Sequence, residues 1–377
     1  MYKRNLEEKI KSHFFKGKII VLYGPRQVGK TTLSKKIVLE MAEKYKIPYK
    51  YIQADVSLER EAFSEVSPEK IKKYFGDAKI VLIDEAQYIK NIGLILKTFI
   101  DKYPEIQIIA TGSASFELAA QIKEPMTGRV FEYFMYPLSV SEVMDGNMFD
   151  YKSKEDFYMR FGLYPGVVNI GESEAVKALQ MMQESYLYKD ILIFENLKRS
   201  DILDKMIKFL AFNVGTVVNT NNISREIGTT SKTVDRYIDL LQKMFVLKKI
   251  YAYSRNPINE IKKGYKIYFY DVGMRNSIIS NHNRLDIRDD IGAIFENFFI
   301  MEKLKYNAAN DIYANIYFWQ NYQGLEVDLI EEYNGKLYAY ECKYKDRKSR
   351  GLKVFAEQYK NTVENIVTKD NYLDFVL

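Results

Sequence analysis

The sequence predicts an α/β fold of several domains that begins with a parallel sheet covered by helices on both faces. Its 377 residues exceed the size of one typical domain, so two or three domains are expected. Four short apolar runs, at residues 18–23, 49–54, 79–84 and 107–111, alternate with helical stretches. Near-continuous apolar strands separated by helices are typical of parallel sheets buried on both faces. We expect this first domain to span residues 1–141.

The composition argues against a disulfide-rich protein, a zinc protein and a membrane-spanning protein. Hydrophobic residues make up 47% of the chain, and the net charge of +6 is a mild excess that permits nucleic-acid binding without arguing strongly for it. A single cysteine, Cys342, excludes a disulfide framework and a cysteine-based zinc site. Two distant histidines, His13 and His282, argue against a histidine metal cluster. No apolar run approaches the ~20 residues of a membrane helix, so we expect a cytoplasmic protein with no membrane segment.

A phosphate-binding motif follows the first apolar run. The pattern G-x-x-x-x-G-K-[ST] is matched between a predicted strand and a predicted helix. Its glycines let backbone N–H groups wrap the β-phosphate, its lysine charge reaches the β- and γ-phosphates, and its threonine hydroxyl faces Mg²⁺. We therefore expect ATP and Mg²⁺ to bind at Gly24, Pro25, Arg26, Gln27, Val28, Gly29, Lys30, Thr31 and Thr32.

The other parts of an ATP-hydrolysing site are expected at later strand ends. Asp84 and Glu85 end the apolar run 79–84, so Asp84 would hold Mg²⁺ with Thr31, and Glu85 would polarise the attacking water. Ser113 either places a hydroxyl near the γ-phosphate or belongs to an ordinary strand-end turn. Arg129 is either an arginine finger, in cis or from a neighbouring subunit of a homo-oligomer, or an exposed loop arginine.

The middle of the chain is predicted to be a helical lid or connector at residues 142–212 followed by a winged helix-turn-helix at residues 213–284. Helices are expected at residues 222–227 and 231–244, with strands at 246–253 and 265–270. Lys232 and Arg236 lie opposite the apolar face of the second helix, where they suit phosphate or major-groove contacts. Because Asp235 and Asp239 dilute this charge, DNA contact and a role in protein packing are both open.

A hairpin in the last block, residues 285–377, brings acidic residues together. Asn334 and Gly335 predict a two-residue turn, which fixes the register of the strands at 325–331 and 336–343. Paired residue numbers then sum to 669, so Asp328 faces Glu341, and Glu326 faces Lys343. The alternative is a misplaced turn and a solvated face.

Two opposed carboxylates repel each other, and a divalent cation between them is the natural compensation. We therefore expect Asp328 and Glu341 to bind Mg²⁺. Glu296, on the preceding predicted helix at 291–305, is a candidate third ligand or an ordinary surface glutamate. Lys343 is placed to stabilise negative charge on a phosphate.

These elements in this order resemble a prokaryotic family of AAA+-superfamily ATPases whose C-terminal region is a domain of unknown function. The resemblance covers nearly the whole chain and is carried by residues 24–32, 83–87, 110–115, 127–129, 136–139, 162–167, 188–190, 266–273, 295–297 and 324–328. It implies a restriction-endonuclease-like C-terminal fold, whose motif is an Asp on one strand and Glu-x-Lys on the next. Asp328, Glu341 and Lys343 match that motif, and Glu296 matches the family's helix acid. The departure from the pattern is the middle residue Cys342.

The expected function is therefore an ATPase coupled through the winged helix to a nuclease-like domain that acts on nucleic acid, DNA above all, in genome maintenance or defence against foreign DNA. ATP and Mg²⁺ are the expected cofactors, and a protein partner is not indicated. The alternative is an ATP-driven regulatory switch whose C-terminal domain binds a partner without cleaving it. A small-molecule kinase fits poorly, because nothing beyond the phosphate loop suggests an acceptor pocket.

Overall fold

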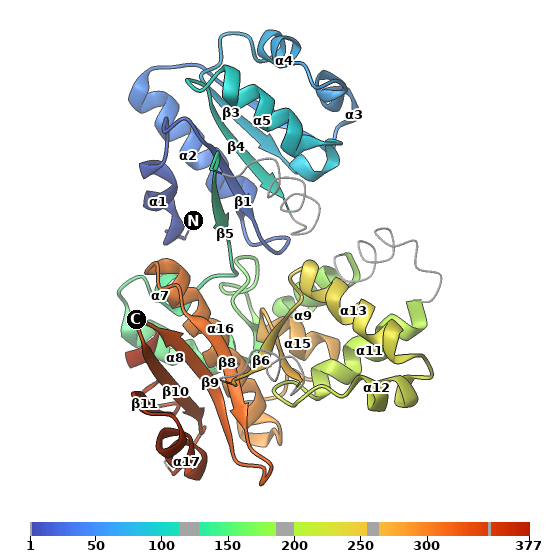
Figure 1. The fold of residues 1–377 in the computed structure, drawn as a ribbon, viewed down its shortest axis with the longest axis vertical. Helices are drawn as coiled ribbons and strands as arrows, with labels where there is room; N and C mark the ends of the chain where they lie inside the picture. The colour runs from blue at the N-terminus through green and yellow to red at the C-terminus, as the bar shows by residue number, and fades with distance from the viewer. Residues whose placement is uncertain (1, 113–127, 186–199, 255–263, 346–347) are drawn as a thin grey trace. The chain divides into compact units, whose positions relative to one another are not determined.

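A computed structural model describes residues 2–112, 128–185, 200–254, 264–345 and 348–377 (Figure 1). Ser113, Thr127 and residues 188–190 lie outside the described residues. The chain forms two compact units, Met1–Pro137 with Lys243–Phe245, and Leu138–Gln242 with Val246–Leu377. The four-domain division expected from the sequence stays a prediction, because this division into two units does not test it.

The first unit contains a parallel sheet of five strands in the order β2-β3-β4-β1-β5. Every neighbouring pair is parallel, which confirms the parallel sheet predicted from the apolar runs. Residues of β3 and β4 are buried along their whole length, as expected for central strands covered on both faces. The strands are β1 (Ile19–Tyr23), β2 (Tyr49–Gln53), β3 (Ile80–Asp84), β4 (Gln107–Gly112) and β5 (Val130–Phe134).

Helices cover this sheet (Figure 1). One core joins alternate side chains of the strands, such as Val21 and Val81, to Phe75 of α4 and Phe99 of α5. The α2 helix, which begins immediately after the phosphate loop, packs against β2, β3 and β4. The helices of this unit are α1 (Leu6–Ser12), α2 (Lys30–Tyr45), α3 (Ser57–Arg60), α4 (Pro68–Phe75) and α5 (Ile92–Lys102), with short 3₁₀ turns η1 (Glu61–Phe63) and η2 (Ala86–Tyr88).

The second unit combines helices with a mixed sheet. Its first helix begins with a capping box, in which Ser139 and Glu142 satisfy each other's backbone N–H groups. The helices are α7 (Val140–Met144), α8 (Met148–Phe161), α9 (Glu172–Met182), α11 (Ser200–Phe212), α12 (Thr220–Ile227), α13 (Ser231–Lys243), α15 (Val272–Ile278), α16 (Ile291–Ala309) and α17 (Arg350–Gln358). The strands are β6 (Leu247–Ala252), β7 (Tyr265–Phe269), β8 (Asn315–Gln320), β9 (Glu326–Tyr333), β10 (Lys336–Cys342) and β11 (Thr362–Val367).

The sheet of the second unit runs across the predicted boundary at residue 285. Its order is β11-β10-β9-β8-β6-β7, so the hairpin of the predicted winged helix joins the C-terminal strands. The link is a parallel pairing of Tyr251 with Tyr317 and of Ala252 with Phe318. Pairing satisfies the backbone groups that an exposed edge strand would leave to water. Sequence periodicity identifies each strand but not its neighbour, so the hairpin was expected to stand apart.

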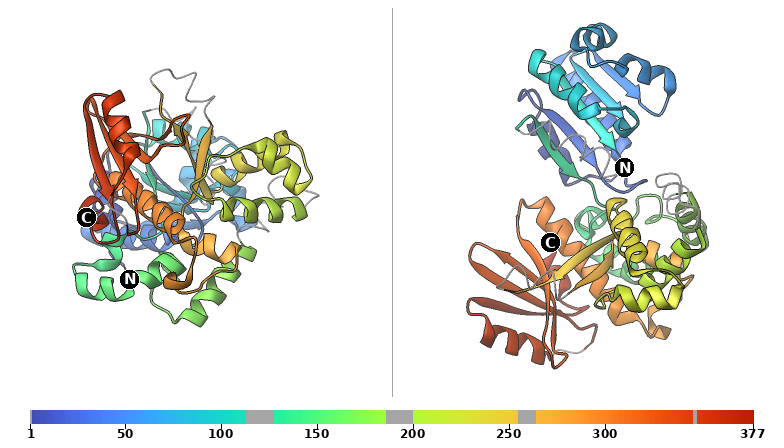
Figure 2. Two further views of the ribbon diagram at one scale, coloured as in Figure 1. Left: turned by 90° about the horizontal axis from the view of Figure 1, so that it is seen from below. Right: turned by 45° about the vertical axis from the view of Figure 1, so that its right-hand side comes forward.

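The C-terminal elements follow the order α16, β8, β9, β10, α17, β11. The strands β8, β9 and β10 are antiparallel neighbours, and β11 lies parallel to β10 after the α17 crossover. One core on the α17 face joins Leu352 and Phe355 to Trp319, whereas Phe299 of α16 contacts Tyr340 of β10. Figure 2 shows the C-terminal strands, in orange to red, from two further sides.

The predicted hairpin register is confirmed for the pairs from Lys336 with Tyr333 to Tyr340 with Leu329. Asn334 (φ 52°) and Gly335 (φ 71°) have the positive φ angles that the expected turn requires. A bulge follows on β9, because Tyr317 pairs with Ile330 but Trp319 pairs with Val327. On β9 this shift falls between Val327 and Ile330, and the regular pairing with β10 ends at Leu329. The predicted pairs of Asp328 with Glu341 and of Glu326 with Lys343 are therefore not part of the observed register.

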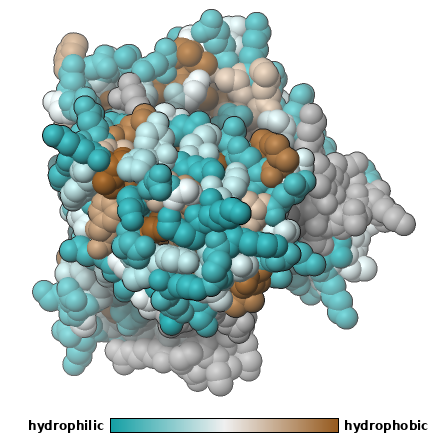
Figure 3. All heavy atoms as spheres, turned by 90° about the horizontal axis from the view of Figure 1, so that it is seen from above, coloured by the Kyte–Doolittle hydropathy of each residue, from teal (hydrophilic) through white to brown (hydrophobic). Residues whose placement is uncertain are grey.

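The surface carries small, separate apolar patches among hydrophilic side chains on the face seen from above (Figure 3). Within the described parts of the chain, no helix is both long enough and apolar enough to cross a membrane.

Candidate functional site

The phosphate loop joins the end of β1 to the start of α2. Gly24 (φ 151°) and Gly29 (φ 95°) adopt backbone conformations that side chains disfavour. At Gly24 a Cβ atom would also lie 2.2 Å from the carbonyl oxygen of Met135, so only glycine fits there. The loop thus ends at a helix N-terminus, where free backbone N–H groups favour an anion.

Lys30 is buried inside this loop. Its ammonium group donates hydrogen bonds to the carbonyl oxygens of Gly24 (2.9 Å) and Pro25 (2.7 Å). Burial lowers the pKa of Lys30 to about 8, although the nearby Glu85 and Asp84 carboxylates favour its charged form. A phosphate oxygen can replace the two carbonyl groups as its partner.

Asp84, at the end of β3, accepts hydrogen bonds from three hydroxyl groups. The Thr31 hydroxyl lies 3.0 and 2.9 Å from the two carboxylate oxygens, and the Tyr51 hydroxyl lies 3.1 Å from Oδ2. The Thr111 hydroxyl donates to Oδ1. The structure therefore brings together Thr31 and Asp84, the two predicted Mg²⁺ ligands of the nucleotide site. A hydroxyl and a carboxylate are oxygen ligands of the kind that Mg²⁺ prefers, so they fit this ion.

Tyr51 and Thr111 were not expected from the sequence. They belong to β2 and β4, the two strands that flank β3 in the sheet. Thr111 lies next to the carboxyl end of β4, and that position was the available signal. Tyr51 lies in the middle of β2, where no local pattern indicates the contact. The hydroxyl assigned to Ser113 lies outside the described residues, and within them Thr111 supplies the hydroxyl of β4.

Glu85 follows Asp84 and turns the chain sharply, with a φ angle of 52°. Its backbone N–H donates to the Thr111 hydroxyl (3.2 Å), and the Gln87 side-chain amide donates to its carboxylate. These contacts hold Glu85 directly after Asp84, with hydrogen-bond partners different from those of the Asp84 carboxylate. The role of Glu85 as the base that acts on water stays a prediction.

Arg129 does not lie near this chain's phosphate loop. It precedes β5, and its carbonyl oxygen accepts a hydrogen bond from the N–H of Ile19, at the start of β1. Because β1 and β5 are parallel, Gly24 lies at the opposite end of these strands. At its own end of the strands, away from Gly24, Arg129 forms an ion pair with Asp101. The role in cis therefore does not fit this position, and a role toward a neighbouring subunit stays a prediction.

Arg4 braces the phosphate loop and was missed in the sequence. Its guanidinium group is buried and donates to the carbonyl oxygens of Val28 (2.9 Å) and Tyr136 (2.6 Å). It thereby connects the phosphate loop to the segment after β5. An arginine before the first strand has no local pattern that indicates this contact.

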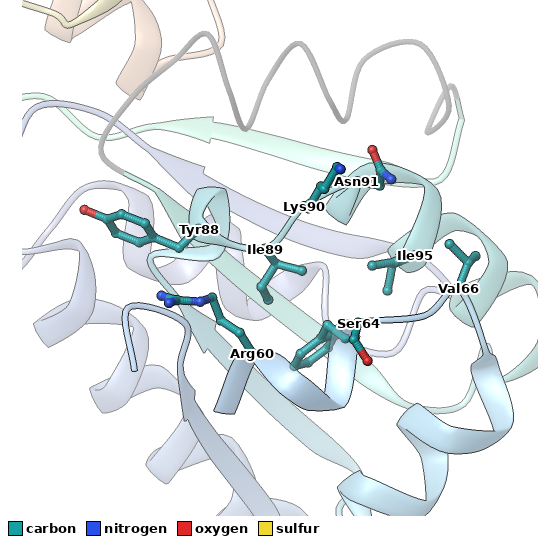
Figure 4. Close-up of a pocket in the computed structure, with 9 residues that line it drawn as sticks. Arg60, Ser64, Val66, Tyr88, Ile89, Lys90, Asn91 and Ile95 are labelled. Carbon is teal, nitrogen blue, oxygen red and sulfur yellow. The ribbon is translucent and has the colours of Figure 1, made fainter. Parts of the chain in front are cut away.

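A pocket of about 270 Å³ lies elsewhere in the first unit (Figure 4). It is lined by residues that follow β2 and β3, among them Arg60, Phe63, Tyr88 and Ile89. The Arg60 guanidinium donates to the carbonyl oxygens of Ala54 and Asp55, so it serves the loop after β2. None of the residues that line the pocket belongs to the predicted nucleotide site.

A second group of charged side chains lies in the second unit, around Lys266 of β7. The Lys266 ammonium lies 3.3 Å from a carboxylate oxygen of Glu326, 3.5 Å from one of Glu296 and 3.7 Å from one of Asp328. Lys266 is only 1% exposed, and the Tyr268 hydroxyl also donates to Glu296 (2.6 Å). We call Lys266, Glu296, Glu326, Asp328, Glu341 and Lys343 the carboxylate cluster.

Glu341 and Asp328 form the other side of this cluster. Lys343 lies 2.9 Å from Glu341 Oε1, and the N–H of Cys342 donates to Asp328 Oδ2 (2.8 Å). Glu341 Oε2 is buried and finds no hydrogen-bond partner among the residues that the structure describes. Burial, followed by the charge of Asp328, raises the pKa of Glu341 to about 7 and that of Glu296 to about 8.

The predicted metal site at Glu296, Asp328 and Glu341 is not formed in this arrangement. No group of three or more His, Cys, Asp or Glu side chains in the described ranges is placed to hold a metal ion. Besides burial, the charge of Asp328 raises the pKa values of both Glu296 and Glu341, so the two glutamates lie near Asp328. However, the cation among them is Lys266, which is 62 positions before Asp328 and beyond the reach of the hairpin argument.

The predicted recognition helix corresponds to α13 (Ser231–Lys243), and its assignment to a winged helix-turn-helix stays a prediction. Lys232 and Arg236 are exposed on α13, and Val234 and Ile238 are buried on its other face. Asp239, one of the two acids expected to dilute the positive charge of this helix, forms an ion pair with Lys249 of β6. This ion pair neutralises part of the negative charge near Lys232 and Arg236.

Three family models match the chain. A model described as an AAA domain matches residues 16–144, and two models of domains of unknown function, DUF8612 and DUF4143, match residues 153–285 and 291–375. An uncharacterised protein of Mycobacterium tuberculosis is 22% identical over 344 residues, covering 90% of this chain and 74% of the relative. An uncharacterised protein of Haemophilus influenzae is 29% identical over 208 residues, covering 52% of each chain.

Solved structures with partial similarity include the replication initiator DnaA bound to AMPPCP and single-stranded DNA. It is 15% identical, covers 63% of this chain and 86% of its own, and has a TM-score of 0.34. The Pif1 helicase from Candida albicans is 15% identical, covers 48% of each chain and has a TM-score of 0.29. Because both scores are below 0.5, assignment of the first unit depends on the family model and on the phosphate loop. On these two grounds, residues 16–144 form an AAA-type P-loop α/β domain.

Proposed function

We propose that this protein binds ATP with Mg²⁺ and hydrolyses it to ADP and phosphate. The observation that carries the proposal is the joining of Thr31 to Asp84 beside the buried Lys30, with Glu85 next along the chain. Lys30 would hold the β- and γ-phosphates, and the loop N–H groups would wrap the β-phosphate. Glu85 would orient a water molecule and take its proton. Thr31 and Asp84 would hold Mg²⁺, which would neutralise negative charge on the phosphates.

Two substitutions separate binding from hydrolysis. Lys30→Ala removes the charge on the phosphates, so nucleotide binding should weaken and hydrolysis should stop. Glu85→Gln keeps the shape but not the base, so ATP should stay bound while the turnover rate falls about 10²- to 10⁴-fold. The measurements are phosphate release and equilibrium binding of a fluorescent ATP analogue.

The matched controls are Lys44→Ala and Glu43→Gln, two exposed positions on α2. Both should hydrolyse ATP at the parent rate. If Lys30→Ala and Glu85→Gln also turn over at that rate, the nucleotide site is not where we place it.

We further propose that ATP hydrolysis is coupled to a nuclease-like C-terminal domain that acts on nucleic acid, DNA above all. The order α16, β8, β9, β10, α17, β11 and the positions of Asp328, Glu341 and Lys343 support this proposal. The test is degradation of single-stranded, duplex and branched DNA with Mg²⁺ or Mn²⁺, with and without ATP. Cleavage that is lost in Asp328→Asn would support it.

A second candidate function is favoured by one observation. Lys266 lies among the acids that a nuclease would use to hold a metal ion. A domain with that arrangement suits binding of a nucleic acid or protein partner under control of the ATP state. DNA binding without degradation would support this regulatory switch.

A further inference from the structure

We propose that Lys266 is the resident cation of the carboxylate cluster, so that Glu296, Glu326 and Asp328 need no divalent metal ion. The inference rests on the second candidate function proposed above and deepens it, since it favours, over metal-dependent cleavage, a C-terminal domain that contacts its partner without cleaving it. The ammonium group of Lys266 has carboxylates of Glu326, Glu296 and Asp328 within 4 Å. A metal ion that bound the same oxygens would have to share their negative charge with this ammonium group.

The position of Lys266 is set by its backbone rather than by chance contact of a flexible side chain. Lys266 pairs with Ile250 in the β6–β7 hairpin and forms an isolated bridge to Val217 on its other side. The side chain then runs beneath the surface, with its ammonium group 5.5 Å from the centre of the Phe318 ring. At 1% exposure the group has no room to turn away into solvent.

Electrostatics makes Lys266 and the carboxylates depend on one another. A buried ammonium group without a partner loses its hydration free energy and forms no ion pair that would offset the loss. The same holds for a buried carboxylate. Asp328 is buried, and the Glu296 side chain is only 15% exposed, so each carboxylate needs a cation or a proton. Lys266 provides the cation from within the chain, which is the role that the sequence had led us to expect of Mg²⁺.

One oxygen of the carboxylate cluster, Glu341 Oε2, is a candidate ligand for a divalent cation. Glu341 Oε2 has no hydrogen-bond partner in the described part of the chain, and Glu341 is only 4% exposed. A divalent cation that entered between Glu341 and Asp328 would satisfy this oxygen even while Lys266 stayed in place. The experiment must therefore ask whether the parent protein binds a metal ion at these two residues.

The test uses the full chain with Asp84→Asn, which disables the nucleotide-site metal ligand, in the absence of nucleotide. Binding of Mn²⁺ is followed by electron paramagnetic resonance and calorimetry. We expect the parent to bind no Mn²⁺ at the cluster. Lys266→Met removes the ammonium group at similar length and should create one Mn²⁺ site per chain, at least tenfold tighter than any binding by the parent. That site should disappear when Asp328→Asn is added.

The matched control is Lys303→Met, which removes a buried lysine of α16 that lies 3.5 Å from a carboxylate oxygen of Glu331. This variant should gain no Mn²⁺ site, because Glu331 belongs to a different group of side chains. If Lys266→Met does not fold, the double variant Lys266→Met/Glu296→Gln, which removes one charge of each sign, takes its place. It should bind Mn²⁺ through Asp328 and Glu341.

Two results would overturn the proposal. One is a Mn²⁺ site in the parent that Asp328→Asn or Glu341→Gln abolishes, and the other is a folded Lys266→Met protein that gains no site. Hydrolysis of ATP is measured separately on the chain with Asp84 intact. Failure of the ATPase proposal and failure of the Lys266 proposal are therefore distinguishable.

Discussion

The Asp84 carboxylate is held in place by hydroxyl groups of neighbouring elements. Hydroxyl groups from α2, β2 and β4 donate to its two oxygens, so the group is held in one orientation at the end of β3. Thr31 and Asp84 can then bind the same ion with little rearrangement, and preorganised ligands lose less entropy on binding. Tyr51 adds a contact that the phosphate-loop motif does not contain, and Lys35 lies over its ring at 3.9 Å.

The lowered pKa of Lys30 makes ATP binding depend on pH. Burial lowers this pKa to about 8, and phosphate oxygens should raise it again by favouring the charged form. Between pH 8 and pH 9 the free protein therefore loses the lysine proton, and binding must take it up. Affinity for ATP should fall about fivefold over that interval, since the charged fraction of the group falls from about 50% at its pKa to ~10% one pH unit above it.

The measurement is calorimetry with a non-hydrolysable ATP analogue in two buffers of different ionisation enthalpy. Proton uptake near pH 8.5 should vanish in Lys30→Met. The unfolding free energy has the opposite pH dependence, because the unfolded chain binds more protons than the folded one between pH 8 and about 10.4, so Lys30 contributes a stability that rises with pH there. Affinity that stays constant to pH 9 would contradict a pKa near 8.

At the scale of elements, α16 connects two parts of the second unit. Glu302 accepts a hydrogen bond from the N–H of Val140 (2.7 Å), and Lys305 donates to the carbonyl oxygen of Leu138 (2.8 Å). Glu296, two turns earlier on the same helix, belongs to the carboxylate cluster. One rigid helix therefore contacts both the first residues of this unit and the cluster.

Helix α17 lies very close to β9, and Gly351 makes this possible. A Cβ atom at residue 351 would lie 2.0 Å from the backbone carbonyl oxygen of Glu326. Gly351→Ala should therefore destabilise the second unit by about 1–3 kcal/mol, as overpacking does. Chemical denaturation of the full chain measures this change.

The control is Gly292→Ala on α16, where a Cβ atom would meet no atom within 4 Å. This change should stabilise the helix by up to about 1 kcal/mol, because alanine restricts the unfolded chain more than glycine does. Equal stability of the two variants would show that α17 does not approach β9 so closely.

The exposed cations of α13 provide a test of nucleic-acid binding at the element scale. If Lys232 and Arg236 contact duplex phosphates, replacing both with alanine should reduce the slope of log affinity against log salt concentration by about 1.8. The loss should be similar for unrelated DNA sequences. Fluorescence anisotropy at several salt concentrations measures the slope.

Lys73→Ala/Lys79→Ala removes two exposed lysines from the first unit and serves as the matched pair. It should leave the slope unchanged. A slope that stays the same in the α13 variant would make the helix-turn-helix a packing module instead.

For the whole molecule, the division into two compact units predicts more than one unfolding step. A non-hydrolysable ATP analogue with Mg²⁺ at a hundredfold excess over its dissociation constant should stabilise the unit that binds it by about 2.7 kcal/mol. Only one step of the thermal unfolding curve should move, and Lys30→Ala should abolish the shift. A curve in which no step moves would contradict nucleotide binding to the first unit.

The sequence by itself determined the features that depend on residues close together in the chain. The strand, glycine loop and helix from β1 to α2 follow from backbone preferences over about ten residues. The Asn334–Gly335 turn likewise determined the register of β9 and β10, because a two-residue turn leaves one pairing of the flanking strands. The positions of Asp84 and Glu85 at a strand end were predicted for the same reason.

Tertiary structure alone decided the contacts between distant segments. Tyr51 reaches Asp84, Arg4 reaches the phosphate loop, β6 pairs with β8, and Lys266 enters the carboxylate cluster. In each case many residues separate the partners, and periodicity gives the face of an element but not the element that covers it. The Asn334–Gly335 turn predicted that Asp328 lies near Glu341, and, besides burial, the charge of Asp328 does raise the pKa of Glu341. The divalent cation expected between them is not supported by the described residues, and Lys266 is the cation found beside Asp328. Burial of a distant lysine is a property of the folded chain, so the turn could not identify it.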